Sequence, residues 1–164
     1  MSQLEQAKID NAIQVKAESS IGQAVIDETS KDEFAGGLRA MQETAVAFLG
    51  LAIVELILKL AGFRYLFSTI KRWPLVGKKT ACPETISRIC SAVDRAATYY
   101  LKHALCLQRS AVTTCLLRMY GVPAQMVIAC RIMPYHGHAW VEVEGVVVND
   151  RQKVQSFYSV LKRC

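Results

Sequence analysis

Three residues toward the C-terminus, Cys106, His138 and Asp150, could together break a peptide bond. A cysteine thiol becomes an effective nucleophile when an imidazole takes its proton and a third group holds the imidazole in place. The thiol stands at the start of a predicted helix, and the other two residues stand on predicted strands. This order favours a cysteine peptidase or an acyl transferase, with Asn149 as the alternative to Asp150 for orienting His138.

A position at the start of a helix suits a nucleophilic thiol. The unpaired amides and the dipole of a helix N-terminus favour negative charge, and therefore favour the thiolate. The same amides could donate hydrogen bonds to the oxyanion that forms when a carbonyl is attacked. We therefore predict Cys106 as nucleophile, His138 as base and then acid, and Asp150 as the group that orients His138.

The periodicity of apolar residues changes along the chain. Spacings of three and four predict helices, and later alternation and β-branched runs predict strands. Helices are predicted over residues 45–61, 84–100 and 106–120, and strands over 125–132, 138–144 and 146–150. Helices followed by an antiparallel meander indicate an α+β fold. In the third helix we expect one buried stripe, formed by Leu107, Ala111, Cys115, Leu116 and Met119.

The apolar run at residues 45–61 is interrupted by Glu55 and Lys59, so it is shorter than the roughly 20 apolar residues that span a bilayer. We predict a helix with most of its surface buried. Residues 63–79 combine aromatic and basic side chains, so peripheral contact with a membrane surface is the alternative for this region.

Charge is distributed unevenly along the 164 residues. Residues 1–48 carry a net charge of −4, whereas the remainder carries +10. We interpret residues 1–37 as an acidic, mobile extension ending in a hinge at Gly36 and Gly37, residues 38–100 as a helical portion, and residues 101–164 as the catalytic core packed with it. The sequence contains no nucleic-acid-binding motif, so we expect no nucleic-acid partner.

Metal binding and export have little support in the sequence. The six cysteines include no C-x-x-C pair, and the polar, acidic start is unlike a secretory signal. His136 and His138 would share a face if both were in a strand, but Pro134 and Gly137 predict a turn there, and no third ligand is evident. We therefore expect a cytoplasmic protein without a metal or a cofactor.

Short sequence motifs between Cys106 and Asp150 resemble those of the transglutaminase-like cysteine peptidases of lasso-peptide biosynthesis, which excise the leader from a precursor peptide. The resembling segments are Cys106-Leu107-Gln108-Arg109-Ser110, residues 116–124, residues 127–131, His138-Ala139-Trp140-Val141-Glu142, Gly145 and Asp150. Residues 48–100 are similar to the helical portion of that family in pattern only.

The resemblance implies a papain- or transglutaminase-like core with Cys106, His138 and Asp150 as its triad. It also implies hydrolysis of one bond between the leader and the core of a lasso-peptide precursor. Residues 1–48 do not read as the family's leader-recognition domain, so we expect a stand-alone peptidase that works with a separate recognition protein and a lasso cyclase. The alternatives are a transglutaminase-like acyl transferase and a non-catalytic partner scaffold.

Overall fold

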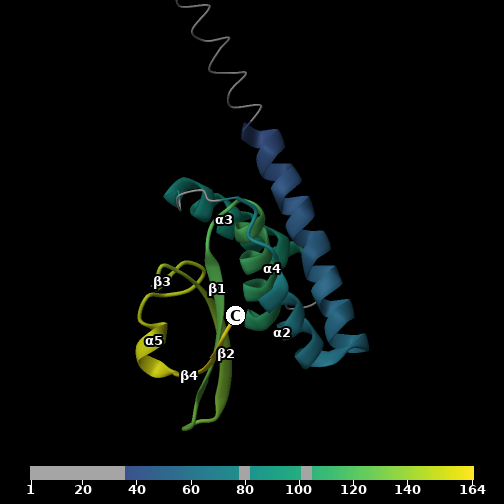
Figure 1. Cartoon of the computed structure of the whole chain (residues 1–164). Coiled ribbons are helices and arrows are strands. Elements are labelled where there is room, and N and C mark those ends of the chain that lie inside the picture. Colours follow the sequence, from purple (N-terminus) through teal and green to yellow (C-terminus); the bar gives the residue numbers. More distant parts are fainter. Residues whose placement is uncertain (1–35, 78–81, 101–104) are drawn as a thin grey trace, which may run out of the picture. The chain divides into compact units, whose positions relative to one another are not determined.

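The computed structural model describes residues 36–77, 82–100 and 105–164 (Figure 1). Residues Ala40–Cys164 form one compact unit, which is separate from the residues up to Arg39. The predicted extension over residues 1–37 thus lies outside the described residues, apart from its last two. Those two, Gly36 and Gly37, are helical.

Helices occupy the first part of the described chain. Residues 36–60 are helical and are followed by α2 (Gly62–Arg72), α3 (Pro83–Tyr99) and α4 (Cys106–Met119). Pro83 occupies the first turn of α3, where its missing N–H costs no helical hydrogen bond. Gly121 follows α4 with a φ of 78°, a left-handed conformation that glycine adopts without strain. The helices α3 and α4 lie within one residue of their predicted bounds.

The sheet has four strands in the order β3-β2-β1-β4, and each neighbouring pair is antiparallel. The strands are β1 (Ala124–Arg131), β2 (His136–Val143), β3 (Val146–Val147) and β4 (Ser159–Arg163). The predicted α+β fold with a meander is confirmed. The start of β2 differs from the prediction, because His136 pairs with Arg131 and Gly137 pairs with Cys130, so both belong to the strand and not to a turn.

The helix α4 lies between the other helices and the sheet (Figure 1). Consecutive residues from Ser110 to Thr114 are buried, because neighbours surround this part of α4 on several sides. Four residues of the predicted stripe lie in or against the main core, whereas Met119, also placed in that stripe, is 50% exposed. Residues 36–60 approach α4 closely at Gly50, where an added Cβ would lie 3.0 Å from Val112 Cγ1.

A second, smaller core lies on the opposite face of the sheet, where Trp140 is fully buried among Val127, Ala129, Val147 and Val154. Val154 belongs to α5 (Val154–Phe157), which the periodicity did not predict. This core fixes the segment after β3 against the sheet, and β4 then pairs with β1.

Glu142 anchors the same face through polar contacts. Its carboxylate accepts hydrogen bonds from Trp140 Nε1 (2.9 Å) and Gln155 Nε2 (2.9 Å), and it forms an ion pair with Arg163. Burial raises the pKa of Glu142, but the hydrogen bonds and the positive charge outweigh burial and hold the pKa below its usual value. The carboxylate therefore stays ionised and connects β2 to α5 and β4.

The helix over residues 36–60 is less buried than predicted. One stripe, including Ala47, Leu51 and Val54, packs inward. The opposite side carries large apolar side chains in contact with solvent, and Leu60 is 79% exposed. The exposed set on this helix includes Leu49, Ile53, Leu56 and Leu60. Among the described residues, no helix is both long enough and apolar enough to cross a membrane.

Candidate active site

His138 and Asp150 contact each other where β2 begins and the segment after β3 passes beside it. His138 Nε2 lies 2.6 Å from Asp150 Oδ2, and the other carboxylate oxygen accepts the backbone N–H of Arg151 at 2.6 Å. Their side chains are 18% and 29% exposed. Because both carboxylate oxygens have partners, Asp150 holds the imidazole in one orientation.

The second ring nitrogen of His138 is placed differently. Nδ1 is buried and has no hydrogen-bond partner in the part of the chain that the structure describes. An ionised carboxylate only accepts hydrogen bonds, so the contact with Asp150 places the proton of a neutral imidazole on Nε2. Nδ1 then carries a lone pair, which a general base needs.

Cys106 is the first residue of α4 and is half-buried. The preceding N–H, that of Leu105, donates to Gln108 Oε1 at 2.8 Å, so the side chain of Gln108 helps to close the start of the helix. The first turn contains no acidic residue. The thiol thus lies where the helix amides and dipole favour negative charge.

A partly buried set of hydrogen bonds, here named the Ser110–Asn149 bridge, joins the segments that carry the three residues. Ser110 Oγ donates to the Ala139 carbonyl at 3.0 Å and accepts from Asn149 Nδ2 at 3.0 Å. Asn149 Oδ1 in turn accepts the N–H of Val141 at 2.7 Å. Ala139 follows His138 directly, and Asn149 precedes Asp150. The bridge therefore links α4 to the two segments that carry His138 and Asp150.

The bridge also bears on Cys106, because residues four apart lie on the same side of a helix, about one turn of 5.4 Å along its axis. Cys106 and Ser110 have this spacing in α4. The structure brings His138 and Asp150 into contact, whereas no hydrogen bond joins the Cys106 thiol to His138 Nδ1 among the residues described. Asn149, the alternative orienting group, bonds Ser110 and Val141 instead.

Tyr158 is a neighbour of His138 that the sequence did not reveal. Its ring centroid lies 5.2 Å from that of His138, and its hydroxyl forms a hydrogen bond of 3.0 Å with His136 Nδ1. Tyr158 stands between α5 and β4, neither of which was predicted. Ser110 was also missed, although its position four residues after a candidate nucleophile could have drawn attention to it.

The two neighbouring histidines have partners of their own. Their ring centroids are 6.1 Å apart, but His136 is bonded to Tyr158 and His138 to Asp150. Within residues 36–77, 82–100 and 105–164, no group of three His, Cys, Asp or Glu side chains is arranged to hold a metal ion.

The six cysteines are unpaired and differ in environment. Burial raises the pKa of Cys90, Cys115 and Cys164 to about 11 in each case. The exposed Cys82 differs, because hydrogen bonds from the backbone amides of Thr85 and Glu84 at the start of α3 lower its pKa. Cys82 is therefore a second thiol that chemical labelling must take into account.

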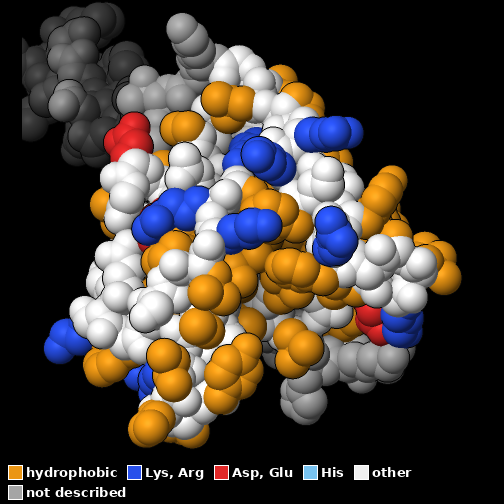
Figure 2. Space-filling model, turned by 60° about the horizontal axis from the view of Figure 1, so that its bottom comes forward, with side chains coloured by type: hydrophobic (Ala, Val, Ile, Leu, Met, Phe, Trp, Pro, Cys, Tyr) orange, Lys and Arg blue, Asp and Glu red, His pale blue; other side chains and the backbone are white. Residues whose placement is uncertain are grey.

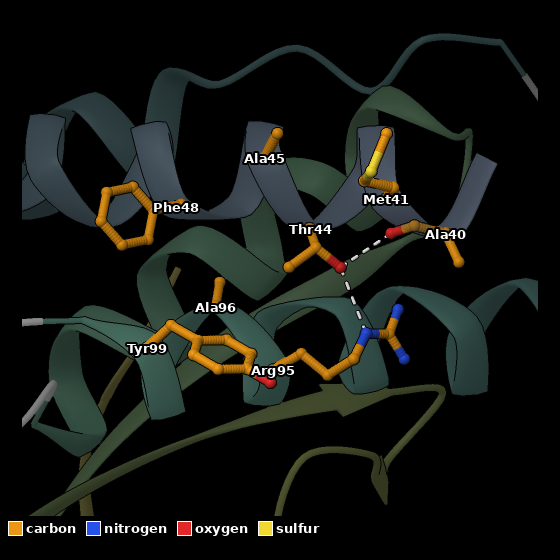
Figure 3. Close-up of a pocket in the computed structure, with 8 residues that line it drawn as sticks. All are labelled: Ala40, Met41, Thr44, Ala45, Phe48, Arg95, Ala96 and Tyr99. Carbon is orange, nitrogen blue, oxygen red and sulfur yellow. Dashed lines mark hydrogen bonds between the residues drawn. The ribbon is translucent and has the colours of Figure 1, made fainter. Parts of the chain in front are cut away.

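A cavity of about 510 Å³ lies away from the candidate site, between the helix over residues 36–60 and α3 (Figure 3). Its lining residues are Ala40, Met41, Thr44, Ala45, Phe48, Arg95, Ala96 and Tyr99. Arg95 Nε donates to Thr44 Oγ1 at 3.2 Å, and Thr44 donates to the Ala40 carbonyl (Figure 3). Neither the thiol nor the imidazole of the candidate site borders this cavity.

Comparison with known proteins agrees with the fold and includes the candidate residues. A family model described as the transglutaminase-like superfamily matches residues 51–162, which contain Cys106, His138 and Asp150. The Microcin J25-processing protein McjB of Escherichia coli is 36% identical over 56 residues, which are 34% of this chain and 27% of that protein. The match thus spans about a quarter of the length of this relative. No solved structure matches.

The family match covers more than half of the chain and includes the helix α4 and nearly the whole sheet. The chain therefore belongs to the transglutaminase-like superfamily.

Proposed function

We propose that this protein is a cysteine peptidase that removes the leader from a ribosomally made lasso-peptide precursor. The observation that supports it best is the contact of 2.6 Å between His138 and Asp150, which leaves Nδ1 of the imidazole buried and unpartnered. Cys106 is the proposed nucleophile, because it begins a helix that the Ser110–Asn149 bridge ties to β2.

The proposed reaction has two stages. His138 Nδ1 takes the proton of the Cys106 thiol, and the thiolate attacks the scissile carbonyl while the first amides of α4 donate to the oxyanion. The C–N bond then breaks as the imidazolium gives its proton to the leaving amine. Water, activated by the same imidazole, hydrolyses the thioester and releases the leader as a free acid. Asp150 stabilises the imidazolium throughout.

Membership of the transglutaminase-like superfamily supports thiol-based acyl chemistry, and the name of the E. coli relative supports a role in processing. The remaining parts of the proposal follow from the resemblance of the sequence to lasso leader peptidases. They are a cytoplasmic setting, a precursor substrate, a separate leader-recognition protein that captures it, and a lasso cyclase that takes the product.

The exposed apolar side of the helix over residues 36–60 supports contact with another macromolecule. Leu49 and Ile53 line an apolar groove of about 190 Å³ together with Leu66 and Trp73 of the region around α2. Hydrophobic side chains gather with Lys and Arg on one face of the molecule (Figure 2). We assign the groove to the recognition protein, since apolar patches of this kind mark interaction surfaces. Co-sedimentation with anionic liposomes at low salt would instead support a membrane surface as its occupant.

The function is tested by incubating the full chain with a candidate precursor and the recognition protein. The masses of the products are then measured by mass spectrometry. We expect a single cut that yields a leader with a free carboxylate. If an added primary amine appears in the product mass, the acyl-transferase alternative holds. If the precursor stays intact with every partner present, the proposed peptidase function is wrong.

A further inference from the structure

A cavity of about 430 Å³ borders the candidate site on the side where the imidazole meets Asp150. Its lining residues are Arg131, His138, Asp150, Arg151, Lys153, Val154, Phe157 and Tyr158. They come from the end of β1, the start of β2 and the segment from Asp150 to Tyr158, so residues far apart in sequence converge here. Cys106 does not line this cavity.

Positive charge dominates the cavity. Arg131, Arg151 and Lys153 contribute three cations, and none of them forms an ion pair with a carboxylate within the described part of the chain. The only acid in the lining, Asp150, already has His138 and the Arg151 N–H as partners. The lining therefore carries three cations against one carboxylate, and an entering anion would meet a net positive charge.

Arg131 is the best-placed of the three cations. Its guanidinium carbon lies 5.7 Å from the centroid of the Tyr158 ring, which keeps the planar group against the cavity wall. Its Nε is buried and has no hydrogen-bond partner among the described residues. A guanidinium held in this way can bind a carboxylate through two parallel hydrogen bonds, which a lysine ammonium cannot do.

The chemistry of the proposed reaction indicates which part of a substrate reaches this cavity. The imidazole that accepts the thiol proton later delivers it to the leaving amine, so the leaving amine must lie on the imidazole side of the thiol. The cavity is bounded by His138 and not by Cys106. We assign the chain that enters it to the segment on the C-terminal side of the cut, which carries the leaving amine.

We propose that the cavity is a subsite for a carboxylate side chain in the segment released with a new N-terminus, with Arg131 and Lys153 as its main contacts. The proposal rests on the proposed peptidase function for the direction of the substrate. The binding of a carboxylate can be measured without any cleavage.

The test uses the full chain with Cys106→Ala, so that a bound peptide stays intact. Fluorescence anisotropy measures its affinity for a labelled pentapeptide with two glutamates, and for the same peptide with two glutamines. We expect the glutamate peptide to bind about tenfold more tightly at low ionic strength. The double substitution Arg131→Gln with Lys153→Gln should remove this preference, and Lys153→Gln alone should reduce it.

A matched control removes the same charge elsewhere. Arg64 and Lys71 are exposed on α2, so Arg64→Gln with Lys71→Gln lowers the net charge by the same amount. This control should keep the preference for the glutamate peptide. Equal affinity for the two peptides, or an equal loss in the control, would overturn the subsite, because the attraction would then be absent or merely general.

Cleavage assays separate the subsite from the proposed function. Precursors with Glu or Gln after the cut should differ mainly in KM, and the double substitution Arg131→Gln with Lys153→Gln should remove that difference. If both are cleaved with the same kcat/KM, the subsite is wrong and the peptidase stands. If neither is cleaved while the glutamate peptide binds preferentially, the peptidase is wrong and the carboxylate site stands.

Discussion

Replacing Cys106 with alanine is expected to lower kcat/KM for precursor cleavage by at least about 10³-fold, because no other group can form the thioester. His138→Ala should cause a similar loss, since the thiol would then lack its base. The measurement is the rate of product formation by mass spectrometry, with the recognition protein present at saturating concentration.

Two controls make this result specific. Cys82→Ala removes an exposed thiol whose pKa is lowered at the start of a different helix, and it should change the rate by less than about twofold. The double variant of Cys106 and His138 should be no slower than either single variant, because residues that act as a unit lose their contribution together. If cleavage persists in Cys106→Ala and is lost in Cys82→Ala, Cys82 is the nucleophile and the assignment of Cys106 is wrong.

Replacing Asn149 with alanine is expected to lower kcat by about 10²-fold while KM changes little. The substitution leaves Ser110 Oγ without its donor and Val141 N–H without its acceptor. The free energy of unfolding should fall by about 1–3 kcal/mol for these buried groups. The larger effect on kcat arises because displacement of reacting groups by about 1 Å can cost about 10²-fold in rate.

Thr114→Val is the matched control for the bridge. Thr114 lies one turn after Ser110 in α4, is buried, and has an Oγ1 without a hydrogen-bond partner among the described residues. Losing this hydroxyl should leave both kcat and stability close to their original values. Chemical denaturation and steady-state kinetics measure the two effects. If Asn149→Ala lowers stability but leaves kcat unchanged, the bridge stabilises the fold without positioning the reacting groups.

The elements around the candidate site could be predicted because their local signals are strong. Pro83 and Gly121 bound helices through backbone constraints that act within a few residues. The alternation after His138 predicted a strand, which β2 confirms. Asp150 was predicted on a strand over residues 146–150, but β3 ends at Val147, so Asp150 reaches His138 from the segment that follows the strand. The order of Cys106, His138 and Asp150 in the sequence therefore predicted the type of reaction that we propose.

Long-range contacts account for what the sequence did not reveal. Every residue of β4 is exposed, so the strand carries no apolar alternation and is defined only by pairing with β1. The four residues of α5 include a single buried one, Val154, which is too little for a periodic signal. Tyr158, placed by these two elements, was missed for the same reason.

Burial was the least predictable property. The apolar run at residues 45–61 predicted a mostly buried helix, but only one side of it packs on the core, because α4 and its neighbours cover one side alone. The helix α4, in contrast, is buried on more sides than its periodicity predicted. Thr113 and Thr114 are buried because the helix is surrounded, although their side chains are polar. The number of neighbours around a helix is a tertiary property that its own periodicity does not record.

The central claim is that His138 takes the proton of Cys106, and the rate of alkylation of Cys106 by iodoacetamide tests it most directly. The measurement is made at mildly acidic pH in a Cys82→Ala background, with the modified residue located by peptide mass mapping. We predict that Cys106 reacts at least about tenfold faster than free cysteine and that His138→Ala abolishes this advantage. Alkylation no faster than that of free cysteine, and unchanged by His138→Ala, would contradict the account.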